Sequence, residues 1–190
     1  VFAASLLSSP GLAEIGSPLQ LASADVSSVG ASEIVELSRE GRHFEAVVQS
    51  MDTGHLPTVS DKLAAAKSAW ALGLVDVARS YWDDALAHRD FRDSERSRAV
   101  LARAIMELQE GNHEEARAFA EAEAMRLSPS DLRAQFWLLI AEALKGQGAN
   151  SLSEQYYKRA LEEGGKETAD EASYLLGECQ YALGLVNDSR

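Results

Sequence analysis

The sequence predicts an all-α protein in which antiparallel helix pairs stack side by side as an α-solenoid. Alanine, leucine and glutamate are frequent, whereas aromatic residues make up only 7% of the chain, a balance that favours helices over sheets. From residue 31 onward, apolar residues recur at the three- and four-residue spacing of amphipathic helices. Glycines also return at nearly regular intervals, which is typical of a helical repeat.

Five glycines mark the repeat. Each follows an amphipathic stretch and, apart from the last, precedes another: Gly41, Gly73, Gly111, Gly148 and Gly184. Their spacings of 32, 38, 37 and 36 residues scatter around the ~34 residues of a two-helix unit. Because glycine adopts left-handed backbone geometry without a steric penalty, each is predicted to form the turn of a helical hairpin.

Mostly small residues recur at two fixed distances from these glycines, and each such set is called a small-residue column below. Five residues after each glycine stand Ala46, Ala78, Ala116, Ser153 and Ser189. Seven residues before each stand Ile34, Ala66, Ala104, Ala141 and Gly177. Since small side chains let two helix axes approach closely, the columns are predicted to lie where the two helices of a hairpin pack together.

Polar residues ahead of apolar runs predict where several helices begin, because such residues cap free backbone amides. The expected caps are Ser60-Asp61, Asp93-Ser94, Asn112, Ser151 and Thr168. The third unit departs from the pattern, since Arg103, Glu107 and Glu123 fall on its expected buried faces. We therefore expect both helices of that unit to be rotated or shifted in register.

Residues 1–30 differ in character from the predicted array of residues 31–190. They carry only two charged side chains, Glu14 and Asp25, and are rich in serine and glycine. The apolar opening and the small residues around Gly11-Leu12-Ala13 are typical of a signal peptide remnant. The alternative is a flexible lead-in or a short helix over residues 2–7. The first interpretation favours a bacterial periplasm or cell envelope, and the second leaves a cytoplasmic location open.

Composition and motifs exclude several classes of function. A net charge of −12 without a Lys/Arg cluster argues against nucleic acid as a partner, and no apolar stretch approaches the ~20 residues of a membrane span. The single cysteine, Cys179, cannot form an internal disulfide. The four histidines do not have metal-ligand spacing, and no nucleophile motif is present. We therefore predict no catalytic residues, no metal and no cofactor.

The fourth unit carries the clearest family resemblance. Its first helix reads WLLIAEAL from Trp137, followed by Gly148, Ser153, Tyr157 and Ala160. This pattern resembles the tetratricopeptide repeat, and the resemblance covers about four and a half repeats over residues 31–190. It implies a right-handed solenoid that acts as a protein–protein interaction scaffold, with a partner peptide or helix in its concave groove.

The resemblance also implies which side chains face the groove, because the first helix of each pair lines it. The expected partner-binding residues are Leu63, Lys67 and Trp70, then Leu138, Glu142 and Lys145, and finally Tyr174, Glu178 and Tyr181. The Lys and Asn residues of family members that clamp a terminal carboxylate are missing. Glu142 and Glu178 favour a partner segment that mixes apolar and basic residues. Alternatively, Leu63, Trp70 and Leu138 are inter-helix core.

Two further functions remain open at this stage. The fifth unit has a good first helix, but only Leu185 to Arg190 follow its glycine, so we expect either a fragment of a longer array or completion by a neighbouring chain. A second copy covering that unit would make the protein a self-assembling module or homo-oligomer. The other alternative is a regulatory domain of a larger enzyme.

Overall fold

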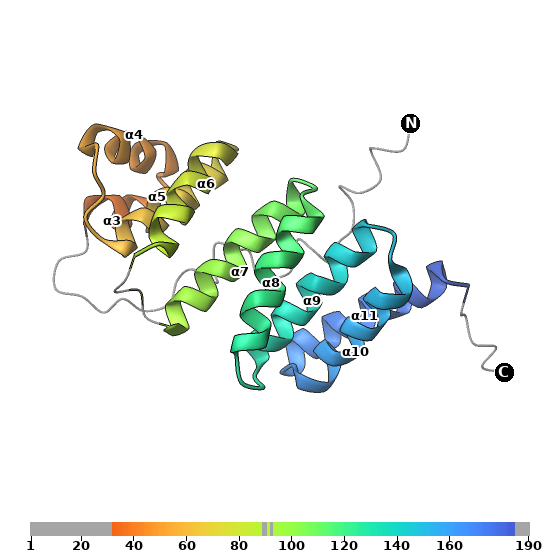
Figure 1. Cartoon of the computed structure of the whole chain (residues 1–190). Coiled ribbons are helices and arrows are strands. Elements are labelled where there is room, and N and C mark those ends of the chain that lie inside the picture. Colours follow the sequence, from red (N-terminus) through yellow and green to blue (C-terminus); the bar gives the residue numbers. More distant parts are fainter. Residues whose placement is uncertain (1–31, 89–90, 92, 185–190) are drawn as a thin grey trace, which may run out of the picture. The chain divides into compact units, whose positions relative to one another are not determined.

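The computed structural model describes residues 32–88, 91 and 93–184, which form nine helices and no strand (Figure 1). The helices are α3 (Glu33–Arg39), α4 (His43–Thr53), α5 (Val59–Ala71), α6 (Val75–Leu86), α7 (Asp93–Gln109), α8 (His113–Arg126), α9 (Asp131–Gly146), α10 (Asn150–Glu163) and α11 (Lys166–Ala182). The all-α prediction is confirmed, and right-handedness stays a prediction. The predicted lead-in of residues 1–30, and Ser189 in the repeat column, lie outside the described residues. None of the described helices is long and apolar enough to span a membrane.

The predicted glycine turns are confirmed at Gly41, Gly73, Gly111 and Gly148, whereas the residues after Gly184 lie outside the described part of the chain. All five repeat glycines have positive φ, between 69° and 80°. After α3, the amide of Gly41 donates to the carbonyl of Ser38, and the amide of Arg42 donates to that of Leu37. The same pair of hydrogen bonds recurs at Gly73, Gly111 and Gly148. This is the Schellman motif, which closes a helix at a left-handed residue and sends the chain back antiparallel.

The small-residue columns lie inside the hairpins as predicted. Ala46, Ala78, Ala116 and Ser153 are fully buried. Ala66, Ala104 and Ala141 are fully buried too. In the fourth hairpin the Ser153 hydroxyl donates to the Ala141 carbonyl at 2.8 Å, which brings the two columns into direct contact. Gly177 is the exception, since it is exposed and a β-carbon there would meet nothing within 4 Å.

The described chain divides into two compact units, with the boundary inside α7 between Ala99 and Val100. In the first unit, α3 packs on α4 and α5, and α5 packs on α6. One apolar cluster there holds Ile34, Leu37, Ala46, Leu56 and Ala65. A second holds Ala85, Phe91 and Ala99, with Leu63 packed against them. In the other unit α8, α9, α10 and α11 pack in chain order, and α11 also touches α9.

The expected shift of the third unit is wrong. Ala104 and Ala116 are fully buried in the same register as in the other hairpins. The charged residues stay buried by pairing instead: Arg103 forms an ion pair with Glu107 one turn later and lies over the Phe119 ring. On α8, Arg126 donates to the buried Glu123 at 2.6 Å. Paired charges therefore occupy positions that other units fill with apolar side chains.

The positions where the second helices begin are set by the glycine turns and not by the predicted capping residues. Each of the second helices α4, α6, α8 and α10 begins two residues after the glycine. The side chain of the residue between them makes no capping hydrogen bond to the helix. Ser151 and Thr168 lie inside helices, so the N-terminal caps predicted there are wrong. α5 is capped by Thr58, whose side chain accepts from the Asp61 amide in a full capping box.

Candidate functional site

Four of the six predicted groove residues of α9 and α11 come together in one polar cluster. Lys145 of α9 lies 3.8 Å from a carboxylate oxygen of Glu142 and 3.2 Å from one of Glu178 on α11. Tyr174 donates its hydroxyl proton to Glu178 at 2.9 Å. Two carboxylates therefore share one ammonium group, which leaves the cluster with a net negative charge.

The same cluster reaches α10 through Tyr157. This buried tyrosine donates a short hydrogen bond to the Glu142 carboxylate. Burial, and then the negative charge of Glu142, raise the pKa of Tyr157 far above its ordinary value. The hydroxyl thus remains a hydrogen-bond donor at every working pH, and Glu142 is held as part of the packing between α9 and α10.

A hollow on α11 presents the most accessible of the predicted residues. It is lined by Ser173, Tyr174, Gly177, Glu178 and Tyr181. The exposed fractions are 52% for Tyr174 and 76% for Tyr181, high values for large aromatic side chains. Their rings and the Glu178 carboxylate offer cation–π and ionic contacts to a basic side chain.

The matching residues of α9 are covered. Leu138, ten residues before its glycine as Tyr174 is before Gly184, is only 3% exposed. Ala141 is buried against α10, and Lys145 is half-buried by its ion pairs. Leu138 therefore contributes to inter-helix packing in the described structure.

The three predicted residues of α5 belong to the other unit. Leu63 packs against the cluster of Phe91 and Ala99. Trp70 meets Trp82 of α6 edge to face, with ring centroids 5.6 Å apart. Burial lowers the pKa of Lys67. All three are half-buried, so each divides its surface between packing and solvent.

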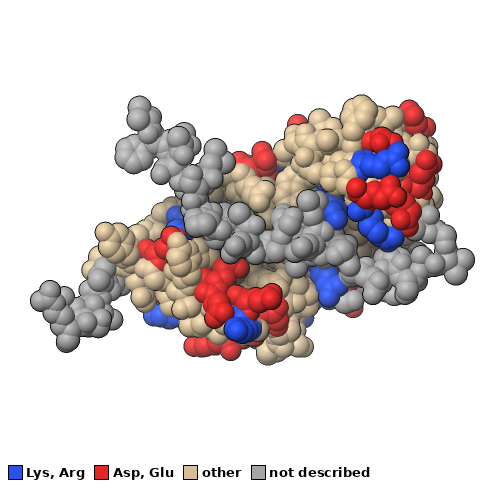
Figure 2. Space-filling view, turned by 180° about the vertical axis from the view of Figure 1, so that it is seen from behind, with Lys and Arg blue, Asp and Glu red and all other residues tan. Residues whose placement is uncertain are grey.

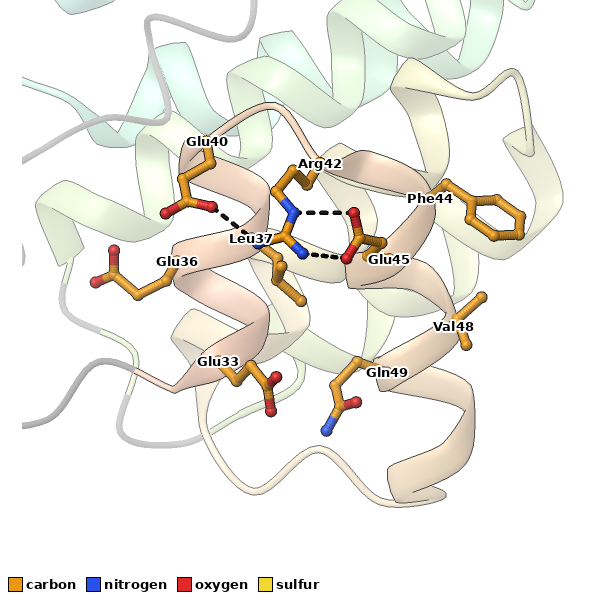
Figure 3. Close-up of a pocket in the computed structure, with 9 residues that line it drawn as sticks. All are labelled: Glu33, Glu36, Leu37, Glu40, Arg42, Phe44, Glu45, Val48 and Gln49. Carbon is orange, nitrogen blue, oxygen red and sulfur yellow. Dashed lines mark hydrogen bonds and ion pairs between the residues drawn. The ribbon is translucent and has the colours of Figure 1, made fainter.

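One surface was missed by the sequence prediction. On α4, Phe44, Val48 and Met51 are all exposed, and the first two help to line a hollow with acidic residues of α3 (Figure 3). The signal is present in the sequence, since these residues stand three, seven and ten positions after Gly41 and differ in kind from their counterparts in other units. Only a comparison of the second helices with one another would have found it.

Two features of the described residues bear on metal binding and on thiol chemistry. Among these residues, no group of three or more His, Cys, Asp or Glu residues is placed to hold a metal ion. Cys179 is buried and donates to the Asn150 carbonyl at 3.3 Å. Burial raises the pKa of the Cys179 thiol, which keeps it in its unreactive protonated form.

Comparison with known proteins gives one match. The tetratricopeptide repeat family model matches residues 63–131, which run from α5 to the start of α9. No curated protein and no solved structure matches the chain. The matched segment contains two glycine-turned hairpins, and the same turn recurs in the described hairpins on either side. The match over residues 63–131, together with the helical hairpins of the described structure, supports a tetratricopeptide repeat protein.

Proposed function

We propose that the protein is a non-catalytic scaffold that binds a segment of a partner protein along its first helices, chiefly α9 and α11. Tetratricopeptide repeats generally mediate protein–protein interactions and are typically non-catalytic. A partner segment that carries both apolar and basic side chains fits this surface best.

The cluster of Glu142, Lys145 and Glu178 carries this proposal. Its surplus negative charge lies beside Tyr174 and Tyr181, whose exposed rings favour apolar contact and cation–π stacking. An arginine or lysine of the partner would meet the Glu178 carboxylate and a tyrosine ring together. The apolar residues of the partner segment would then cover the remaining ring surface.

Selection from a random peptide display library on the immobilised chain tests the proposal. Enriched peptides should combine apolar residues with Lys or Arg and should lose binding to Glu178→Lys and to Tyr181→Ser. Both residues have substantial exposed surface, so these variants should keep the helical content of the parent chain. Glu142 is a poorer probe, because Tyr157 depends on it for a hydrogen bond.

The control is Met125→Ser on α8, which changes an exposed apolar residue outside the cluster. Enriched peptides should bind this variant as they bind the parent chain. Selection of peptides without basic residues, or binding that survives both α11 substitutions, would remove the groove assignment.

Self-assembly is a second candidate function, favoured by the uncovered glycine of α11. Ala66, Ala104 and Ala141 are buried at the position that Gly177 occupies, so this face of α11 has room for another helix. Sedimentation of the chain beside Gly177→Leu tests it, since the larger side chain should block a close helix and lower any self-association. The regulatory-domain alternative and a bacterial envelope location both remain predictions.

A further inference from the structure

A second apolar surface lies on α4, in the unit that also contains α5. Phe44, Val48 and Met51 are 70%, 41% and 54% exposed, respectively. Their spacing of four and then three residues places them in one stripe along a single face of the helix. Figure 3 shows Phe44 and Val48 projecting from the same side of α4, away from α3.

Comparison with the other second helices shows that this stripe is particular to α4. The matching positions hold Asp76, Ser80 and Asp83 in α6, Glu114, Ala118 and Glu121 in α8, and Ser151, Gln155 and Lys158 in α10. Most of these side chains are polar and almost all are exposed. The repeat geometry therefore directs this face outward, where large apolar residues lower solubility unless something covers them.

Acidic residues border the stripe. The hollow beside Phe44 and Val48 is also lined by Glu33, Glu36, Glu40 and Glu45, with Arg42 as its only cation. Arg42 is held by Glu40 at 3.3 Å and by Glu45, so its charge is already neutralised inside the hollow. Figure 2 shows this mixture of acidic and basic side chains over α3 and α4. Arg39 also pairs with Glu36 at 2.9 Å, so four carboxylates stand against two guanidinium groups and leave a net negative border.

We propose that the stripe of Phe44, Val48 and Met51 with its acidic border is a docking surface for a basic amphipathic helix of a partner protein. The apolar face of such a helix would cover the stripe, and its lysines or arginines would lie against Glu33, Glu36 and Glu40. The surface belongs to the compact unit that does not contain α9 and α11.

The negative charge of the border distinguishes among the molecules that could cover the stripe. Residues 1–31 of the chain hold two acidic side chains and no basic one, so they offer nothing to the acidic border. A second copy would bring a chain with a net charge of −12 against carboxylates. A membrane surface that carries anionic lipids would be repelled for the same reason. A basic helix is the occupant that satisfies the stripe and its border together.

The test uses a helical peptide of about 18 residues, long enough to extend past α4, with leucine on one face and lysine on the other. Its binding to the full chain is followed by fluorescence anisotropy. The variant Phe44→Asp/Val48→Ser/Met51→Asp gives α4 the residue types of α6 and should weaken binding about tenfold or more. Because this variant adds negative charge, binding by general electrostatic attraction would become tighter, not weaker.

Four further measurements separate this surface from the groove and from non-specific attraction. The triple variant should have the same effect in a Glu178→Lys/Tyr181→Ser background, where the proposed groove is disabled. Met125→Asp, an exposed apolar site on α8, should leave binding unchanged. Glu33→Gln/Glu40→Gln should weaken binding and reduce its dependence on salt. A peptide with glutamate in place of lysine should not bind.

Photo-crosslinking identifies the occupant directly. With p-benzoylphenylalanine in place of Phe44, illumination should join the full chain to the lysine peptide. A crosslink to residues 1–31 of the same chain, or to a second copy, would overturn the proposal, as would unchanged affinity of the triple variant. If only the groove variants Glu178→Lys and Tyr181→Ser had no effect on binding, the proposed function would be contradicted and the proposal for this surface would still hold.

Discussion

Arg133 in the first turn of α9 donates two parallel hydrogen bonds to Glu163, the last residue of α10. The Nε and one Nη of the guanidinium donate to the two carboxylate oxygens, each at 2.7 Å. Trp137 adds a longer bond to the same carboxylate at 3.3 Å. This fork ties the open ends of the fourth hairpin together, opposite the glycine turn that joins the helices at their other end.

We predict that Glu163→Gln destabilises the chain, because the amide cannot accept both guanidinium bonds and carries no charge. The neighbouring variant Glu162→Gln is the control, since Glu162 is exposed and changes charge equally. Urea unfolding followed by circular dichroism should give a lower midpoint for Glu163→Gln than for Glu162→Gln. Equal midpoints would show that the fork adds no stability.

The same pair predicts a pH dependence. The hydrogen bond from Arg133 holds the pKa of Glu163 below its ordinary value. A carboxyl group with a lowered pKa in the folded state stabilises the fold at neutral pH, and this contribution is lost as the pH falls from about 4.5 through the folded value. The difference in unfolding free energy between the parent chain and Glu163→Gln should therefore shrink in that range. A difference that is constant down to pH 3 would contradict the assignment.

The glycine turns and small columns could be predicted from sequence because each depends on one residue type at one place. The positive φ at position 148 requires glycine, and the close contact between helices at position 141 requires a small residue such as alanine. The interactions of Arg103 and Glu107 could not be predicted from residue type, because a charge on a buried face is acceptable only when a partner lies within reach. The periodic pattern indicates burial but does not show that partner.

The groove was harder to predict for a related reason. Position in the repeat identified Lys145 and Glu178, but their 3.2 Å contact depends on how α9 and α11 pack. The same rule grouped Leu138 with Tyr174, although the first is buried and the second is exposed. What covers a residue depends on the neighbouring helices and not on its place in its own helix.

Two glycines offer a matched test of backbone strain. Gly148 has a φ of 77°, which costs an L-residue with a β-carbon about 1–2 kcal/mol, so Gly148→Ala should destabilise the chain by that amount. Gly177 lies within α11 with open space around its β-position, so Gly177→Ala should stabilise it by about 0.5–1 kcal/mol. Chemical denaturation of both variants gives the two values. Effects of the same sign would contradict this account of the turns.

His43 gives a second pH prediction, in the first unit. Burial, and then the positive charge of Lys67, lower the pKa of His43, whose ring lies 3.2 Å from the Ser68 hydroxyl. As the pH drops below about 6.5, His43 is protonated in the unfolded chain before it is protonated in the folded chain. The free energy of unfolding therefore falls in this range. His43→Gln should remove this part of the decline while retaining a hydrogen-bonding side chain. Matched unfolding curves at pH 7.5 and 5.5 provide the comparison.

The buried pair of Arg103 and Glu107 gives the largest predicted effect. Their side chains are 3% and 0% exposed, and Asn112 donates a further hydrogen bond to the Glu107 carboxylate. Glu107→Leu alone removes the carboxylate that pairs with the buried Arg103 guanidinium and should cost about 3–5 kcal/mol. Arg103→Met/Glu107→Leu removes both charges and leaves apolar side chains of similar size, so its cost should be far smaller. Equal losses in the single and double variants would show that packing around the pair, and not the broken ion pair, determines the stability of the third hairpin.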